Sequence, residues 1–313
     1  MKRSSYIYIT LLLAAITGCK KSTIVQVGDA ATGAQIKFVH AAPGTPAIDG
    51  FVNNVKITPS AVVTVTDNQV VSSITTGLSY SYLGSAATYL ALFPGSNYAA
   101  VQAGSTVIKV ATSTPTPALI TAQTSAAGAT LGTVTQSTTT GSAYSVFAMG
   151  LAGSTAAPLG IKVTEDKFPD ATSGKAYVRF AYMVPNGAAV DVKSTYTPTG
   201  GAATTAVMLS NITYSTVTDF VAVNVNPSGT TNYTFQMFLT TTATALGPVS
   251  AAIALAPGRY YTVVARGLAA DYPVPGTSIV LKSTARPISS TDPSAKLPEI
   301  YFNPISMVYY TNK

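Results

Sequence analysis

The chain has 313 residues, of which 18 are basic and 11 acidic, with one histidine, one cysteine and no tryptophan. The basic residues are scattered, which argues against the clustered basic face that nucleic-acid binding needs. One histidine and one cysteine argue against a zinc or copper site, which needs clustered ligands. A single cysteine also excludes an internal disulfide bond. No cofactor is predicted.

The first residues have the order of a secretory signal. Lys2 and Arg3 form a short positive region, and a mainly apolar run over residues 6–16 follows. Signal peptides use an apolar run of about 7–15 residues. A membrane-spanning helix needs about 20, so this run is too short to be one.

The four residues Ile16, Thr17, Gly18 and Cys19 resemble the lipobox of bacterial lipoproteins, in which an apolar residue and two small residues precede a cysteine. The resemblance implies cleavage between Gly18 and Cys19, lipidation of Cys19 and anchoring in the outer membrane, on either its periplasmic or its surface face. Each buried CH₂ contributes about 0.8 kcal/mol, so two or more acyl chains anchor stably. The alternative is an ordinary signal peptide in which Cys19 is incidental.

The rest of the chain has the composition of a β protein. Only 9% of its residues are charged, and threonine, serine, alanine, glycine and valine dominate. Such a chain is rich in strand and turn formers and poor in long helix formers. Its length suffices for two domains of about 100–150 residues.

One motif occurs twice at an offset of 142 residues. The segment from Ile36 to Asp49 aligns without gaps with the segment from Val178 to Asp191, and Lys37 aligns with Arg179. A second motif, Gly141 to Gly150, aligns with Gly258 to Gly267 at an offset of 117. The first unit therefore has about 25 extra residues between its motifs, and the stretch over 111–140 is their predicted place.

These repeats predict the organisation of the chain. Residues 1–18 are a signal peptide and 19–34 a lipidated linker. Residues 35–152 are the first repeat and 176–313 the second repeat with a C-terminal extension. Residues 153–175 are predicted to be an exposed connector, because Glu165, Asp166, Lys167 and Asp170 cluster there around Pro169.

Within each repeat, alternation with period two predicts strands. Ile36, Phe38 and His40 share one face of the first strand, and Lys37 and Val39 share the other. Many short strands separated by turn residues favour a sandwich or barrel. The predicted fold is all-β, with two tandem immunoglobulin-like β-sandwiches. The runs 277–282 and 305–310 are expected to add strands to the second.

The two motifs resemble those of the domain-of-unknown-function family 4397. Its members begin with a strand of the type V-R-[FV]-[VL]-[HN]-A-[SA]-P and end with G-x-x-Y-T-V-x-x-x-G. The second repeat departs from this pattern at Tyr182 and Val184. The resemblance implies a tandem immunoglobulin-like envelope lipoprotein, and it carries no catalytic or ligand-binding residues with it.

No catalytic constellation is predicted. His40 aligns with Tyr182, so a ring with a polar tip suffices there, and we expect a half-buried structural residue. Asp49 and Asp191 recur at one motif position, and a carboxylate pair can hydrolyse glycosides. They lie in different repeats, however, so each is predicted to accept hydrogen bonds from its neighbouring proline–glycine turn.

Tyrosine is abundant, with 18 residues. Tyr80, Tyr82, Tyr89 and Tyr98 cluster in the first repeat and could stack on a glycan or a protein partner, because tyrosine is amphipathic and favoured at interfaces. The alternative is packing inside the sandwich.

The sequence thus favours a lipid-anchored, non-catalytic envelope protein, a binding or structural module whose partner is a glycan or protein. One alternative is an accessory subunit of a surface glycan- or nutrient-uptake complex. The other is a carboxylate-dependent hydrolase.

Overall fold

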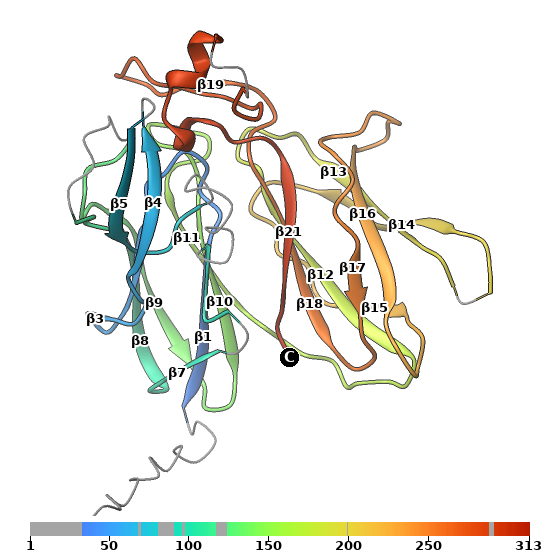
Figure 1. Cartoon of the computed structure of the whole chain (residues 1–313). Coiled ribbons are helices and arrows are strands. Elements are labelled where there is room, and N and C mark those ends of the chain that lie inside the picture. The colour runs from blue at the N-terminus through green and yellow to red at the C-terminus, as the bar shows by residue number, and fades with distance from the viewer. Residues whose placement is uncertain are drawn as a thin grey trace, which may run out of the picture. The chain divides into compact units, whose positions relative to one another are not determined.

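The computed structural model describes residues 33–67, 70–80, 91–95, 98–116, 124–198, 200–287 and 291–313 (Figure 1). In these residues the regular structure is almost entirely β-strand, which confirms the predicted all-β class. Residues 32–313 form one unit. The strands fall into an N-terminal half, β1 to β11, and a C-terminal half, β12 to β21.

The N-terminal half contains two larger sheets. The first inner sheet has the order β11-β10-β1-β6, with β7 also paired to β1, and the first outer sheet has the order β3-β2-β8-β9. Strands β4 and β5 form a separate hairpin. The bounds are β1 Ala34–His40, β2 Ile48–Val52, β3 Val55–Lys56, β4 Ala61–Asp67, β5 Val70–Thr76, β6 Leu92–Phe93, β7 Ala99–Val101, β8 Gly104–Thr112, β9 Thr130–Thr138, β10 Ala143–Met149 and β11 Gly160–Glu165.

The C-terminal half repeats this plan. The second inner sheet has the order β15-β12-β18-β21, and the second outer sheet has the order β14-β13-β16-β17. A link from β18 to β21 carries the small sheet β19-β20 and two 3₁₀ turns, η2 and η3. The bounds are β12 Lys175–Met183, β13 Val190–Tyr196, β14 Thr204–Ile212, β15 Val221–Asn224, β16 Thr231–Leu239, β17 Ile253–Leu255, β18 Tyr260–Arg266, β19 Tyr272–Pro273, β20 Val280–Leu281, η2 Pro293–Lys296, η3 Glu299–Tyr301 and β21 Ser306–Thr311.

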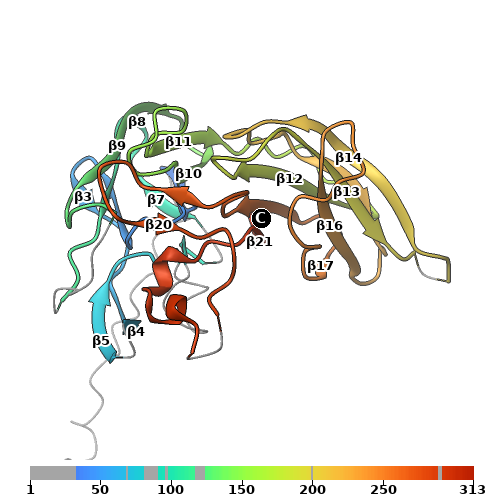
Figure 2. The same ribbon diagram turned by 90° about the horizontal axis from the view of Figure 1, so that it is seen from above.

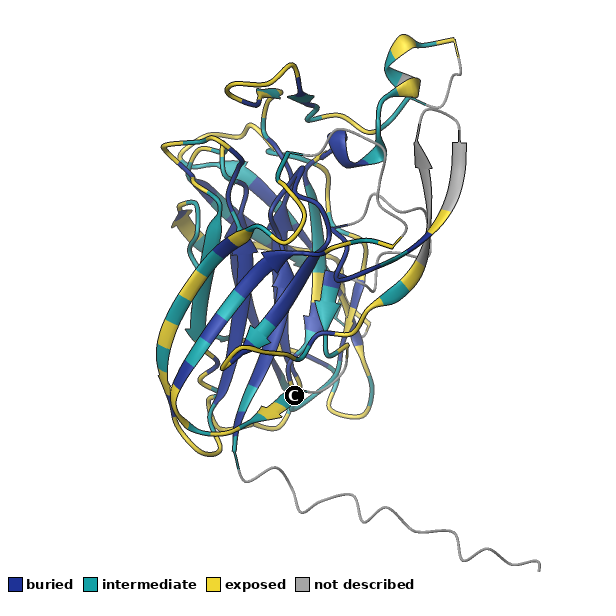
Figure 3. Ribbon diagram, turned by 90° about the vertical axis from the view of Figure 1, so that its left-hand side faces the viewer, coloured by how far each residue is buried: buried dark blue, intermediate teal, exposed yellow. Residues whose placement is uncertain are grey.

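Inner and outer strands differ in burial (Figure 3). Strand β18 is buried at every position, and β12 at every position after Lys175. Strand β9 instead alternates between exposed and less exposed positions. Alternation is typical of a sheet with one solvated face, and continuous burial of a sheet covered on both faces. The inner sheets are therefore covered on both sides.

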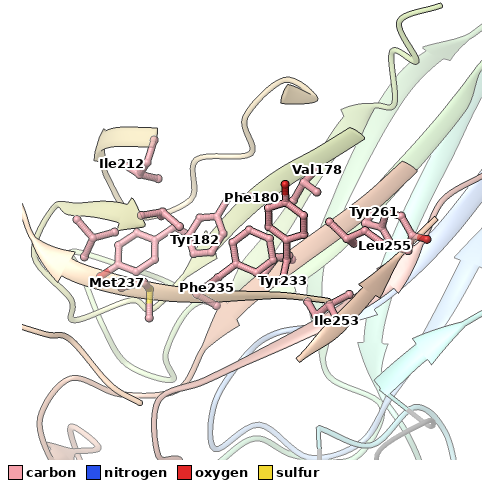
Figure 4. Close-up of a cluster of buried hydrophobic side chains, with 14 of the residues drawn as sticks. Val178, Phe180, Tyr182, Ile212, Tyr233, Phe235, Met237, Ile253, Leu255 and Tyr261 are labelled. Atoms are coloured by element: carbon pink, nitrogen blue, oxygen red, sulfur yellow. The ribbon is translucent and has the colours of Figure 1, made fainter. Parts of the chain in front are cut away.

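Three hydrophobic clusters show what covers them. Side chains of β1 and β10 pack against those of β2 and β8 in the N-terminal half. In the C-terminal half, Val178 and Phe180 of the inner sheet pack with Phe235 and Met237 of the outer sheet (Figure 4). A third cluster joins β1 and β10 to β12, β18 and β21. Each half is thus consistent with a β-sandwich, and the two inner sheets pack on each other, with the halves side by side in Figure 2.

The pairing of strands confirms that the two sequence motifs are structurally equivalent. Strand β1 runs parallel to β10 and β12 parallel to β18, with Lys37 opposite Ser145 and Arg179 opposite Thr262. Strands β11 and β21 occupy the next place in each inner sheet. The predicted strand over 305–310 thus joins the second inner sheet as β21, whereas β20, in the predicted run 277–282, pairs with β19 instead.

Two expectations about the N-terminal half are wrong. Residues 160–165, inside the predicted exposed connector, form β11 and pair with β10. Asp166, which follows directly, is only 4% exposed. The extra residues are not all in the stretch 111–140 either, because β9 in that stretch matches β17, whereas the β4–β5 hairpin has no match among the described strands of the C-terminal half.

Two equivalent glycines turn the chain at the end of the second motif. Gly150 has φ +99° and Gly267 φ +113°, and a Cβ on either would overlap the carbonyl oxygen of a proline, Pro158 or Pro304. Left-handed backbone costs other residues about 1–2 kcal/mol, and overpacking adds about 1–3 kcal/mol. We expect Gly267→Ala to lower the free energy of unfolding by about 2–5 kcal/mol in urea denaturation.

The matched control for this substitution is Gly276→Ala. Gly276 has φ +74°, but open space surrounds the position of its Cβ. Only the backbone cost of about 1–2 kcal/mol is expected there. Equal losses in the two variants would show that the close approach to Pro304 has no effect on stability.

Candidate functional site

The contact between the inner sheets contains a polar cluster as well as apolar side chains. Its members come from both halves and are linked by hydrogen bonds. We call it the central polar cluster, and it consists of Tyr98, Ser145, Asp166, Arg179, Thr262, Tyr310 and Asn312.

An ion pair lies at the middle of this cluster. Arg179 Nη2 is 2.6 Å from Asp166 Oδ1, and the side chains are 2% and 0% exposed. Arg179 also donates from Nε to Thr262 Oγ1 at 2.8 Å and from Nη2 to Ser145 Oγ at 3.0 Å. A buried charge pair is tolerated when further hydrogen bonds satisfy it. These contacts meet that condition.

The remaining oxygen of Asp166 is equally well engaged. Ser145 Oγ donates to Asp166 Oδ2 at 2.7 Å, and the Tyr98 hydroxyl donates to the same oxygen. Asn312 Nδ2 donates to the Tyr98 hydroxyl at 2.6 Å. The cluster therefore ties β10 and β11 of one half to the end of β21 in the other.

Lys37 approaches the same region from β1. Its Nζ donates to the carbonyl oxygen of Pro94 at 2.7 Å and lies 5.0 Å from the ring centroid of Tyr98 and 5.5 Å from that of Tyr310. Burial lowers the pKa of Lys37 to about 8, although the negative charge of Asp166 opposes this shift.

The cluster follows the duplication with one asymmetry. Lys37 and Arg179 are equivalent cations, and Ser145 and Thr262 equivalent hydroxyls. The equivalent of Asp166 is Asn312, since their backbone amides bond to the carbonyls of Ala143 and Tyr260, which occupy matching places. A carboxylate thus stands on one side and an amide on the other.

His40 is fully buried rather than half-buried as expected. Burial lowers its pKa to about 3, so the ring is neutral, and Nε2 donates to the carbonyl oxygen of Pro46 at 3.0 Å. At the matching place the Tyr182 hydroxyl donates to the carbonyl of Ala188 at 2.8 Å. This equivalence confirms that a ring with a polar tip suffices at the position.

A second buried cation lies beside His40. Arg266 is 4% exposed; its Nη1 donates to the backbone oxygen of His40 at 3.2 Å, and its guanidinium lies 4.5 Å from the ring centroid of Tyr80. Burial lowers the pKa of Arg266, yet an arginine stays charged in proteins. Within the described residues, Arg266 has no carboxylate partner.

A cavity of about 230 Å³ adjoins this arginine. It lies between β6 and β21, the edge strands of the two inner sheets. Its walls are mainly apolar and include Leu92, Val264 and Val308, with His40 and Arg266 as polar members. Tyr309, which also lines it, is 48% exposed, so the cavity reaches the surface there.

The predicted aromatic surface is not formed by the two described tyrosines. Tyr80 is buried with its ring 5.5 Å from that of His40, and the Tyr98 hydroxyl belongs to the central polar cluster. The expectation of a shared exposed surface is wrong for these two, because Tyr80 is buried and the half-buried Tyr98 uses its hydroxyl within that cluster. Tyr82 and Tyr89 lie outside the described residues, as do Gly18 and Cys19.

Asp49 and Asp191 lie on different outer sheets, in β2 and β13. Asp49 pairs with Lys56 at 3.0 Å. Asp191 accepts hydrogen bonds from the Asn211 amide at 2.8 Å and from Thr240 Oγ1 at 3.3 Å, which lower its pKa. The expected bonds from the proline–glycine turns are therefore wrong, because the side chains point to neighbouring strands and loops.

The charged members of the buried contact were missed in the sequence. Arg179 and Lys37 interrupt strands whose neighbouring positions are apolar, and charges at matching positions of two repeats are a usable signal. The position of Arg266 offers a second signal, because the aligned residue of the first repeat, Met149, is apolar and a charge there is unexpected. Asp166 had none, since it lies among other charged residues.

In the described part of the chain, no three histidine, cysteine or acidic side chains come together as metal ligands. No helix among those residues has the length and hydropathy to cross a membrane.

The comparisons with known proteins assign the family. The model of DUF4397, a domain of unknown function, matches residues 34–193, which is more than half of the chain. The match begins at the first residue of β1 and ends within β13, so it covers the N-terminal half and the first motif of the C-terminal half. No curated protein matches the chain. The chain belongs to the DUF4397 family.

Proposed function

We propose that this protein is a lipid-anchored, non-catalytic module of the cell envelope, in which two immunoglobulin-like sandwiches act as one rigid binding or structural unit. The two four-stranded sheets of the C-terminal half contain eight strands, within the range of immunoglobulin-like domains, which have about seven to nine strands. Its partner is a glycan or another envelope protein.

The observation that carries this proposal is the buried contact between the two inner sheets. Apolar side chains of both halves meet there around the Asp166–Arg179 pair. Because the inner sheets pack on each other, a partner would bind the outer sheets, the strand edges or the loops. Asp49 and Asp191 lie in the two outer sheets, with both inner sheets between them, which speaks against a hydrolase that uses this pair.

Lipidation of Cys19 is tested by feeding an alkyne analogue of palmitate to a bacterium that expresses the full chain. We expect label on the wild type, loss of label and release from the membrane fraction in Cys19→Ser, and retained label in Thr17→Ala, which keeps a small residue before Gly18. Cys19 is the only cysteine. A labelled Cys19→Ser protein, or an unlabelled wild type, would contradict the anchor.

The binding role is tested with residues 32–313, which form one unit. Glycan arrays and affinity capture from envelope extracts are expected to return a saturable partner. Failure on both would count against the binding role, whatever the outcome of the labelling.

A further inference from the structure

The region around Arg266 contains an unusual number of buried polar atoms without partners. Arg266 Nε, His40 Nδ1 and the Tyr80 hydroxyl each lack a hydrogen bond within the described residues. More than about nine in ten buried polar groups in proteins are satisfied, so three exceptions in one place need an explanation. They lie next to the cavity, which Arg266 and His40 line.

The positive charge of Arg266 is also without a counter-ion among the described residues. Burying a cation without a counter-ion is costly, and the other buried arginine at the contact, Arg179, has Asp166 at 2.6 Å. Among the residues that the structure describes, the partners of Arg266 are a backbone carbonyl and an aromatic ring. The guanidinium is therefore electrostatically incomplete, and an anion would supply the counter-charge and the acceptor that Arg266 Nε lacks.

The duplication shows that the fold does not require this cation. The equivalent of Arg266 is Met149, which pairs with Gly160 as Arg266 pairs with Ser306. Met149 packs against the apolar cluster between the inner sheets. An apolar side chain therefore fills that position in one half, whereas in the other half a charged side chain lies beside a cavity.

The walls of the cavity define the rest of the ligand. Leu92, Val264 and Val308 present apolar surface close to the guanidinium. The volume of about 230 Å³ is below the range of about 300–1,000 Å³ typical of sites for drug-sized ligands. The occupant is thus a small molecule with one anionic group and an apolar body.

We propose that this cavity binds a small organic carboxylate, whose carboxyl group pairs with Arg266 and whose apolar body lies against Leu92, Val264 and Val308. Arginine and carboxylate match in geometry, because two parallel N–H donors can meet two oxygens. The inference deepens the proposed binding role by adding a ligand class, and it is independent of the lipid anchor.

Hexanoate is the probe, and hexan-1-ol, with the same chain length and no charge, is the matched ligand control. Calorimetric titration of the full chain in detergent is expected to show saturable binding of hexanoate and weaker binding of hexanol. In Arg266→Met, which copies Met149, hexanoate binding is expected to fall by about ten- to a hundredfold, the value of a charged hydrogen bond. Arg259→Met, which removes an exposed arginine, is expected to bind like the wild type.

Thermal unfolding provides a second readout that needs no variant. Hexanoate is expected to raise the midpoint of the wild type, because a ligand that binds only the folded state stabilises it, and hexanol to raise it less. Equal shifts by both ligands, equal affinity in Arg266→Met, equal binding of inorganic phosphate, or no saturable binding up to the solubility of hexanoate would each overturn the proposal. Partner capture and palmitate labelling are read separately, so failure here leaves those results standing.

Discussion

Replacing Asp166 with asparagine is expected to lower the free energy of unfolding by about 3–5 kcal/mol, the usual loss when one partner of a buried ion pair is removed. The side chain keeps its size, but Arg179 then remains charged and buried without its partner at 2.6 Å. Asparagine already stands at the equivalent position, 312, so the backbone is not the cause of the loss. Urea denaturation at pH 7 measures it.

Asp170→Asn is the control, because Asp170 is exposed and lies four residues further along the same segment. A surface change of this kind stays within about 0.5 kcal/mol. The double variant Asp166→Asn, Arg179→Met is expected to recover part of the stability, since it removes the uncompensated cation as well. If Asp166→Asn behaved like Asp170→Asn, the ion pair would have no role in holding the halves together.

Alkaline solution is expected to unfold the protein steeply above pH 10. Burial raises the pKa of tyrosines that lie wholly or partly inside, and six of them are Tyr80, Tyr98, Tyr182, Tyr214, Tyr233 and Tyr310. A group whose pKa is higher in the folded state stabilises the fold below its unfolded pKa, near 10 for tyrosine, and loses that effect as the pH rises. All six groups therefore act in the same direction.

The contribution of a single tyrosine to this pH dependence can be measured at Tyr80. Burial raises its pKa to about 12, so its contribution disappears between pH 10 and pH 12 and amounts to about 2–3 kcal/mol. Its hydroxyl has no hydrogen-bond partner among the described residues, so Tyr80→Phe is expected to be nearly neutral at pH 7 and to flatten the alkaline decline. Denaturation midpoints at pH 8, 10 and 11, with tyrosinate absorbance, measure both effects. An unchanged decline in Tyr80→Phe would show that the ring is accessible.

Lys37 acts in the opposite direction at lower pH. Its folded pKa of about 8 lies below the ordinary lysine value of 10.5, so the unfolded chain binds more protons between these values and stability rises with pH there. The full profile is therefore expected to rise from pH 8 and to fall above pH 10. Lys37→Met is expected to remove the rise and leave the fall.

The fold class, the duplication and the faces of individual strands follow from the residue pattern. Alternation placed Ile36 and Phe38 on a core face, as the structure shows. The adjacent Tyr260 and Tyr261 follow the same rule: Tyr261 lies in the core of the C-terminal half, and Tyr260 stacks on Tyr177 at 4.8 Å. These features are local, because side-chain direction along a strand has a period of two.

What the opposite face of these strands packs against depends on how the sheets are arranged in space. Lys37 and Arg179 alternate with core residues, a pattern that normally indicates a solvated face, yet both are buried because the two inner sheets pack on each other. The sequence placed Asp166 in an exposed connector, because the residue that pairs with it, Arg179, lies on a different strand and the pairing has no local signature. The cavity at Arg266 likewise depends on two edge strands that meet in space but are far apart in the chain. A local pattern records which residues share a face, whereas the packing of whole sheets determines whether that face meets water, a counter-ion or a cavity.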